Sequence, residues 1–251
     1  MRQYKSKSAA EYFCNNRTSL DDFYDSEKFI LKEYINDIKN ASNTQFLLDI
    51  GCAAGGLGKS LKDILHNKLD YTGIDINPES IKLGKKKFKE LNLIEGDFSQ
   101  NIENLSSKEI NTIISLSCID WNENFEQSMK TILDLCKKKK SDFIFTFRAA
   151  EKECNDIKKS YQFVNYKNLR EGEIANYVVI SYENLQKIIK IFEPFEVVLY
   201  AYRGKPSSVA ETPYRELIFG CMWLKNCFIK KKSDKTLIKG QYPIDLIMNK
   251  N

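Results

Sequence analysis

The strongest constraint on the fold is the stretch 47–58, which reads LLDIGCAAGGLG. A short apolar run ends in an acid, Asp49, and glycines follow within two residues. This pattern predicts a buried strand, a tight turn and the start of a helix. Glycines let the backbone approach a ligand closely, and the N-terminus of a helix presents free N–H groups to it. We therefore expect a binding loop directly after the first strand.

From residue 45 onward, strand-like and helix-like segments alternate along the chain. We predict strands at 46–50, 71–76, 93–95, 111–117 and 142–147, and helices at 56–66, 78–91 and 123–137. This alternation predicts an α/β, Rossmann-like fold with a mostly parallel sheet and helices on both faces. Ligands on such sheets bind beyond the carboxyl ends of the strands.

The segments on either side of this alternating region are predicted to belong to the same domain. Residues 1–44 have a mainly helical pattern, and we expect them to form an N-terminal helical lid on a binding domain at 45–251. A polar insertion at about 150–175 is a second candidate lid. Ser181 is expected to cap a helix that runs to about residue 191, and the segments 195–202 and 217–228 read as a closing antiparallel pair.

Composition excludes several classes of protein. The net charge is only +5, and no RNA-binding motif accompanies the lysine clusters, so nucleic acid is not the favoured partner. No apolar run approaches the roughly 20 residues of a membrane span, and residues 1–17 lack the apolar core of a signal peptide. The seven cysteines are scattered without a CxxC pair, which argues against a disulfide framework or a metal site. We expect a cytoplasmic protein without a metal.

Two nucleotide cofactors are compatible with the glycine loop. The dinucleotide pattern G-x-G-x-x-G with a following acid is matched by Gly51, Ala53, Gly56 and Asp75, with one substitution. Asp75 can accept hydrogen bonds from the ribose hydroxyls of either cofactor. The glycine spacing alone therefore leaves NAD and S-adenosylmethionine (SAM) open.

Two further acids favour SAM. Asp49 stands where a dinucleotide-binding loop normally has an apolar residue, and SAM carries both a sulfonium and an ammonium group. Asp97, within Gly96-Asp97-Phe98, can accept from the exocyclic amine of adenine while Phe98 covers the ring face. A dehydrogenase would leave both acids without a role.

Over roughly residues 45–150 the chain resembles the class I, Rossmann-like SAM-dependent methyltransferases. The glycine motif is matched by LLDIGCAAGGLG, the ribose acid by Asp75 in YTGIDINPESI, the adenine acid by Asp97 in EGDFSQ, and the motif after the fourth strand by IISLSCIDW. The segment ISYENLQKIIKIFEPFEVVLYAYRGKP resembles the end of the same fold. The resemblance implies a seven-stranded sheet with an antiparallel last strand, SAM bound across these loops, and methyl transfer to a nucleophile above the fourth strand.

The resemblance and the residues together define a candidate cofactor site. Its members follow the first four strands: Asp49, Gly51, Cys52, Ala53, Gly55, Asp75, Ile76, Asp97, Phe98 and Ser117. Arg17 is expected to meet the SAM carboxylate, because N-terminal segments of the family often fold over the cofactor; the alternative is a solvated helix residue. Cys52 is interpreted as a small residue and not as a nucleophile.

The candidate acceptor site lies after the fourth strand. Small-molecule members of the family often carry a histidine there, but this chain has Asp120 and Trp121, and its only histidine, His66, ends the first helix of the binding domain. Asp120 is either the general base or an acid that begins a helix, and Trp121 either walls the methyl channel or packs on that helix. Four more residues complete the predicted acceptor site: Tyr4 and Tyr12 of the N-terminal segment, and Arg148 and Arg203 at one rim.

We predict methyl transfer to a small molecule, with a hydroxyl as the acceptor group. Two guanidinium groups suit an anionic metabolite, such as a nucleotide-linked sugar or a phosphorylated compound, although a surface salt bridge is the plainer interpretation. One alternative is an RNA- or protein-modifying methyltransferase, favoured by the lysine excess but lacking the NPPY or DPPY motif. Another is a SAM- or nucleotide-binding protein without catalysis.

Overall fold

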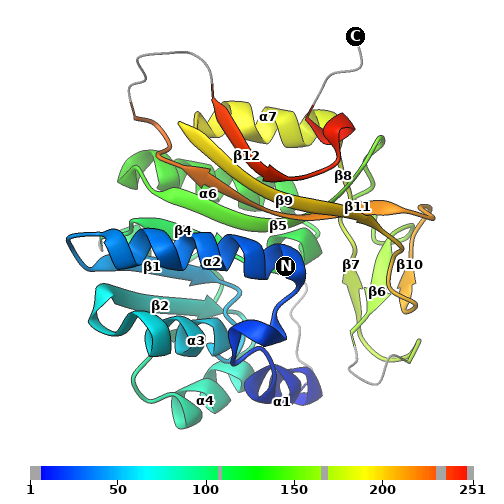
Figure 1. The fold of residues 1–251 in the computed structure, drawn as a ribbon. Helices are drawn as coiled ribbons and strands as arrows, with labels where there is room; N and C mark the ends of the chain where they lie inside the picture. Colours follow the sequence, from blue (N-terminus) through cyan, green and yellow to red (C-terminus); the bar gives the residue numbers. More distant parts are fainter. Residues whose placement is uncertain (1–6, 107–108, 165–168, 230–235, 248–251) are drawn as a thin grey trace.

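The computed structural model describes residues 7–106, 109–164, 169–229 and 236–247. Within these ranges, nine strands form one large sheet (Figure 1). Its strands are β1 (Gln45–Ile50), β2 (Leu69–Asp75), β3 (Asn92–Glu95), β4 (Thr112–Ser115), β5 (Asp142–Ala150), β8 (Ile180–Ser181), β9 (Glu196–Gly204), β11 (Leu217–Lys225) and β12 (Leu237–Gln241).

The order of the main strands confirms the predicted Rossmann-like fold. The path runs β3-β2-β1-β4-β5-β11-β9, with β1 to β5 parallel and β11 antiparallel to both of its neighbours. Two strands extend this seven-stranded core: β12 pairs with β9 at one edge, and the short β8 pairs with the end of β5. The sequence did not predict β12, because its residues are mostly exposed and lack an apolar pattern.

Helices cover both faces of the sheet, as expected (Figure 1). One face carries α2 (Asp25–Asn40), α3 (Gly56–Leu65) and α4 (Pro78–Lys87), and the other carries α5 (Ile102–Ser106), α6 (Phe125–Lys139) and α7 (Tyr182–Phe192). Local signals begin these helices where the sequence predicted. Asn77 caps α4 by accepting from the N–H groups of Glu79 and Ser80, and Ser181 caps α7 by accepting from Asn184.

The N-terminal segment differs from the predicted lid at 1–44. The apolar stripe of α2, which includes Ile30, Leu31 and Tyr34, is completely buried against the sheet and α3. An exposed lid cannot bury such a stripe, so α2 is a layer of the domain itself. The shorter helix α1 (Lys7–Asn15) packs on α4, and the Lys87 ammonium donates to the carbonyl of Cys14 (2.6 Å).

The predicted insertion at about 150–175 contributes to a second, small sheet. This sheet consists of β6 (Tyr161–Phe163), β7 (Ile174–Asn176) and β10 (Ala210–Glu211), all antiparallel. It stands beside the carboxyl ends of the main parallel strands (Figure 1). Within the described ranges, no helix is both long and apolar enough to cross a membrane.

Candidate active site

The turn between β1 and α3 is a left-handed glycine loop. Gly51, Ala53 and Gly55 all have positive φ angles, of 77°, 48° and 86°. A Cβ at position 51 would lie 2.2 Å from the sulfur of Cys118, so the loop has no room there for a side chain. Ala53 is a non-glycine residue in a region that L-residues seldom adopt, and its conformation therefore needs an external partner.

Asp75 at the end of β2 is that partner. Its Oδ2 accepts from the backbone N–H of Ala53 (2.7 Å), and its Oδ1 accepts from the N–H of Asn77 (2.8 Å). Burial raises the pKa of the Asp75 carboxyl, while these two N–H groups oppose the shift. Each carboxylate oxygen has a second lone pair, so the residue can close the loop and still accept from a ligand. The neighbouring Ile76 is half-buried.

Asp49 lies inside the end of β1. Only 3% of the residue is exposed, and its Oδ2 accepts from the hydroxyl of Tyr71 (2.6 Å). Burial raises the pKa of Asp49 to about 7, and the hydrogen bond from Tyr71 opposes that shift. A cation placed beside this carboxyl would favour its ionised form. Burial also raises the pKa of the Cys52 thiol, which keeps it protonated and a poor nucleophile.

Asp97 and Phe98 follow β3 but differ in exposure. Asp97 is half-buried, and its Oδ1 accepts from the N–H (2.9 Å) and the hydroxyl (2.7 Å) of Ser99. Phe98 is buried in the core cluster that contains Leu105 and Ile110. Little of its ring is exposed, so Phe98 serves the core in this structure, and its contact with an adenine face stays a prediction.

Asp120 and Arg148 form a buried ion pair at the ends of β4 and β5. The Arg148 guanidinium lies 3.1 Å from Asp120 Oδ2, and each side chain is 6% exposed. Arg148 also donates to the backbone carbonyls of Val178 (3.2 Å) and Asp120. The second oxygen of Asp120, Oδ1, is buried without a hydrogen-bond partner among the residues that the structure describes. Burial raises the pKa of Asp120, although Arg148 opposes the shift.

Aromatic rings enclose this ion pair. The guanidinium of Arg148 lies 4.6 Å from the ring centroid of Trp121 and 3.9 Å from that of Tyr177. The two rings meet edge to face with their centroids 5.9 Å apart. Trp121 therefore packs on Arg148 and Tyr177, which come from elsewhere in the sequence, and not simply on the helix that follows it.

Arg203 does not share a rim with Arg148, contrary to the prediction. In the register of the sheet, Arg148 and Tyr202 both align with the same residue of β11 and so point to the same face. Adjacent residues of a strand point to opposite faces, so Arg203 points away from the face of Arg148. Arg203 is largely exposed and pairs with Asp245 and, at 3.4 Å, with Glu216. It therefore belongs to the surface salt bridges.

A buried acid that the sequence analysis missed, Glu27, organises the N-terminal side of the site. Its Oε2 accepts from the Arg17 guanidinium (2.7 Å) and from the N–H of Tyr24 (3.0 Å), and its Oε1 accepts from the Ser117 hydroxyl (3.2 Å). Arg17 is thus turned toward Glu27. Glu27 is three residues after the N-cap of α2, but that N-cap is Tyr24 and not the Ser or Thr of a capping-box sequence, so no local motif pointed to Glu27.

The remaining predicted residues are scattered. Tyr12 lies on α1, partly exposed, with its ring edge-on to Phe13. Tyr4 lies outside the described residues. His66 is exposed at the end of α3, as predicted. Across the described ranges, no group of three or more His, Cys, Asp and Glu side chains is arranged to hold a metal ion.

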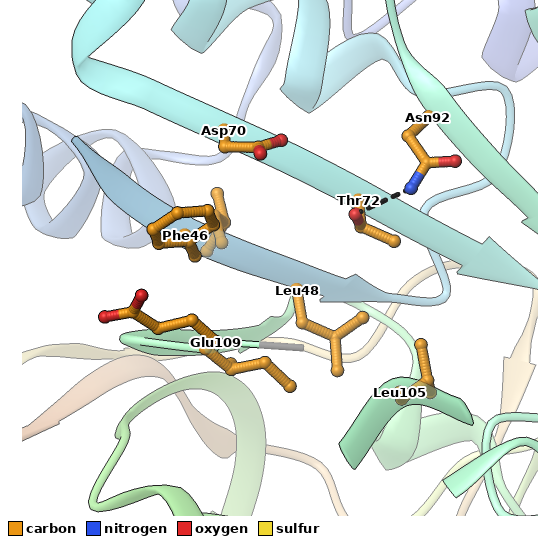
Figure 2. Close-up of a pocket in the computed structure, with 9 residues that line it drawn as sticks. Phe46, Leu48, Asp70, Thr72, Asn92, Leu105 and Glu109 are labelled. Carbon is orange, nitrogen blue, oxygen red and sulfur yellow. Dashed lines mark hydrogen bonds between the residues drawn. The ribbon is translucent and has the colours of Figure 1, made fainter. Parts of the chain in front are cut away.

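A pocket of about 340 Å³ lies at the amino ends of the parallel strands (Figure 2). Phe46, Asp70 and Asn92, at the starts of β1, β2 and β3, line it, and Asn92 donates to the Thr72 hydroxyl (2.9 Å). The glycine loop follows the carboxyl end of β1, so it lies at the opposite ends of these strands. The pocket is therefore separate from the candidate active site.

Comparison with known proteins identifies the family. A family model described as a methyltransferase domain matches residues 41–202, which is more than half of the chain. The chain is a class I SAM-dependent methyltransferase. The cofactor that this family implies is SAM.

Individual relatives of this methyltransferase are distant. It is 33% identical over 84 residues to an 18S rRNA (guanine-N(7))-methyltransferase, RID2, of Arabidopsis thaliana, a match that covers 34% of the chain and 28% of the relative. It is 27% identical over 142 residues to the non-reducing polyketide synthase mapC of Penicillium brevicompactum, covering 49% of the chain and 6% of the synthase. The chain thus spans less than a third of the length of these two relatives.

A solved structure supports the fold of the methyltransferase. The N-terminal domain of EvdMO1, solved with SAH bound, superposes with a TM-score of 0.52 at 8% identity, covering 88% of this chain and 82% of that one. Such a likeness concerns the fold.

The side chains around the glycine loop suit SAM chemically. Asp49 offers a buried carboxylate to a positively charged group, and Asp75 has lone pairs left for hydroxyl donors. The first turn of α3 adds backbone N–H groups that have no acceptor within the helix. NAD carries two phosphates and would meet the Asp49 carboxylate unfavourably when that group is ionised.

Proposed function

We propose that this methyltransferase transfers the methyl group of SAM to a hydroxyl oxygen of a small molecule bound above the carboxyl ends of β4 and β5. The observation that carries the proposal is the unpartnered, buried Oδ1 of Asp120 at this edge of the sheet. The cofactor contacts are proposed on chemical grounds. Asp49 faces the charged part of SAM, Asp75 accepts from the ribose hydroxyls, and Asp97 accepts from the adenine amine.

The reaction requires one bond to form, one to break and one proton to leave. When bound, SAM supplies an electrophilic methyl group on its sulfonium. The acceptor oxygen forms a bond to the methyl carbon as the carbon–sulfur bond breaks, and the hydroxyl proton goes to a base. Oδ2 of Asp120 is engaged by Arg148, so Oδ1 is the oxygen that remains for the proton. Burial, which raises the pKa of this carboxyl, also makes it a stronger base.

The proposed acceptor need not be anionic. The charge of Arg148 is compensated by Asp120, and the charge of Arg203 by Asp245 and Glu216. The Arg148 pair is buried and will not release its guanidinium to a substrate without a large cost. An anionic acceptor, such as a nucleotide-linked sugar or another phosphorylated metabolite, is the alternative that the experiment below compares with a neutral acceptor.

One observation favours a second candidate, an RNA acceptor. The rRNA methyltransferase of Arabidopsis thaliana is similar to this chain over 84 residues. An excess of five positive charges would assist contact with a phosphate backbone, but it is small.

The decisive experiment follows the label from methyl-labelled SAM into separate small-molecule, RNA and protein fractions. Label in a small-molecule fraction supports the proposal, and neutral and phosphorylated subfractions then separate the two acceptor types. Label confined to RNA or protein refutes it. Calorimetric titration with SAM, SAH and NAD runs alongside, and we expect NAD to bind far more weakly than SAM.

A further inference from the structure

Glu27, near the start of α2, makes more contacts than a helix cap requires. In a capping box the carboxylate accepts only from the N–H of the N-cap residue, and Glu27 does so with Tyr24 (3.0 Å). It also accepts from the Arg17 guanidinium and from the Ser117 hydroxyl. Its side chain is fully buried, at 0% exposure. Burying a carboxylate costs free energy unless it is well paired, and these extra contacts offset that cost.

The two extra contacts come from two different segments of the chain. Arg17 has a left-handed backbone (φ 62°), and a Cβ on Gly56 would lie 2.3 Å from the Arg17 carbonyl oxygen. The main chain of Arg17 therefore rests directly on the first turn of α3. Its guanidinium lies 4.5 Å from the ring centroid of Phe23, which further restricts its position.

Ser117 approaches from the sheet. It follows β4, has a positive φ of 50°, and its N–H donates to the Thr146 hydroxyl (2.6 Å). Its own hydroxyl then donates to Glu27 (3.2 Å). A strained serine held at both its N–H and its hydroxyl has little freedom, so the position of the chain at the end of β4 depends in part on Glu27.

We infer that Glu27 is a positioning residue for the cofactor: by binding Arg17 and Ser117 together, it sets the N-terminal segment and the end of β4 against the glycine loop in the arrangement that binds SAM. This inference rests on the proposed function and on the sequence prediction that Arg17 and Ser117 belong to the cofactor site. Glu27 itself acts only through these two residues.

The test compares Glu27→Gln with a matched control, Asp142→Asn. Asp142 is likewise a carboxylate that accepts from more than one donor, the Trp223 indole (3.0 Å) and the N–H of Asn226 (2.7 Å). It lies at the start of β5, at the amino ends of the parallel strands and away from the glycine loop. Both variants should lower the melting temperature. At a temperature where both are folded, Glu27→Gln should weaken SAM binding in calorimetry about tenfold, as expected for loss of a charged hydrogen bond. Asp142→Asn should leave the SAM affinity unchanged within about twofold, the usual error of such a comparison.

A double-mutant cycle keeps the inference testable if Glu27→Gln does not fold. Arg17→Gln and Ser117→Ala each remove one contact and leave the carboxylate in place. If Glu27 links the two residues, their effects on SAM affinity are coupled by about threefold or more. Additive effects, or an unchanged SAM affinity in folded Glu27→Gln, overturn the inference. Failure of the unmodified protein to bind SAM would instead refute the proposed cofactor site.

Discussion

The buried pair of Asp120 and Arg148 supports a prediction in which stability and catalysis can be separated. Asp120→Asn preserves the shape of the side chain and removes its charge. The guanidinium of Arg148, 6% exposed, is then left without a counter-charge, although it keeps its bonds to the carbonyls of Val178 and Asp120. Removing one partner of a buried pair costs about 3–5 kcal/mol. For a domain of this size we therefore expect the melting temperature to fall by roughly 6–20 °C.

The opposite single variant and the double variant complete the cycle. Arg148→Met leaves the Asp120 carboxylate buried and alone, and it should cost a similar amount. The double variant, Asp120→Asn with Arg148→Met, buries no uncompensated charge. We expect its loss of stability in urea unfolding to be smaller than the sum of the two single losses by about 1–3 kcal/mol. Additive losses would mean that the two side chains do not interact as the structure describes.

Turnover of the same variants tests the proposed base. At a temperature where Asp120→Asn is folded, loss of a general base should lower the rate by ~10²–10⁴, with SAM affinity almost unchanged. A loss of less than about threefold would show that the proton leaves by another route, since positioning alone can supply much of the rate. A parallel fall in SAM affinity would show instead that this loop contacts the cofactor.

Three further outcomes are expected. Asp75→Ala removes the acceptor of two backbone N–H groups, so it should lower the melting temperature and weaken SAM binding by about tenfold or more; an unchanged SAM affinity in a folded variant would exclude Asp75 as the ribose ligand. The pKa of Asp49 is about 7 in the folded protein, against an ordinary 3.8. The folded state therefore binds the carboxyl proton more tightly than the unfolded state does. The stability that this proton contributes is present below pH 4 and is lost as the pH rises to 7. Urea unfolding across pH 4–7 should therefore show a smaller loss of stability with rising pH in Asp49→Asn than in the unmodified protein, and equal slopes would contradict the assigned shift. Gly51→Ala places a Cβ 2.2 Å from the sulfur of Cys118 at a φ of 77°, and it should lower both the melting temperature and the SAM affinity; a normal melting curve would mean that the loop adapts freely.

The sequence by itself determined the parts of this protein that depend on neighbouring residues. Apolar runs and glycines at 47–58 predicted β1, a tight turn and α3, and the caps Asn77 and Ser181 predicted where α4 and α7 begin. Periodicity and capping act within one or two turns of chain, so they can be read without knowing the fold. Because the carboxyl ends of parallel strands lie together, the same pattern also placed Asp49 and Asp75 close to each other at these ends.

Only the tertiary structure decided which charges neutralise one another. Arg148 is paired with Asp120 inside the protein, while Arg203 points to the opposite face, and both facts depend on the register of strands far apart in the sequence. Glu27 contacts Ser117 across 90 residues of chain, and no local pattern encodes that pairing. The free energy of burying a charge depends on the partners that folding brings to it. This is why the proposed acceptor need not be anionic, and why Glu27 is proposed as a positioning residue.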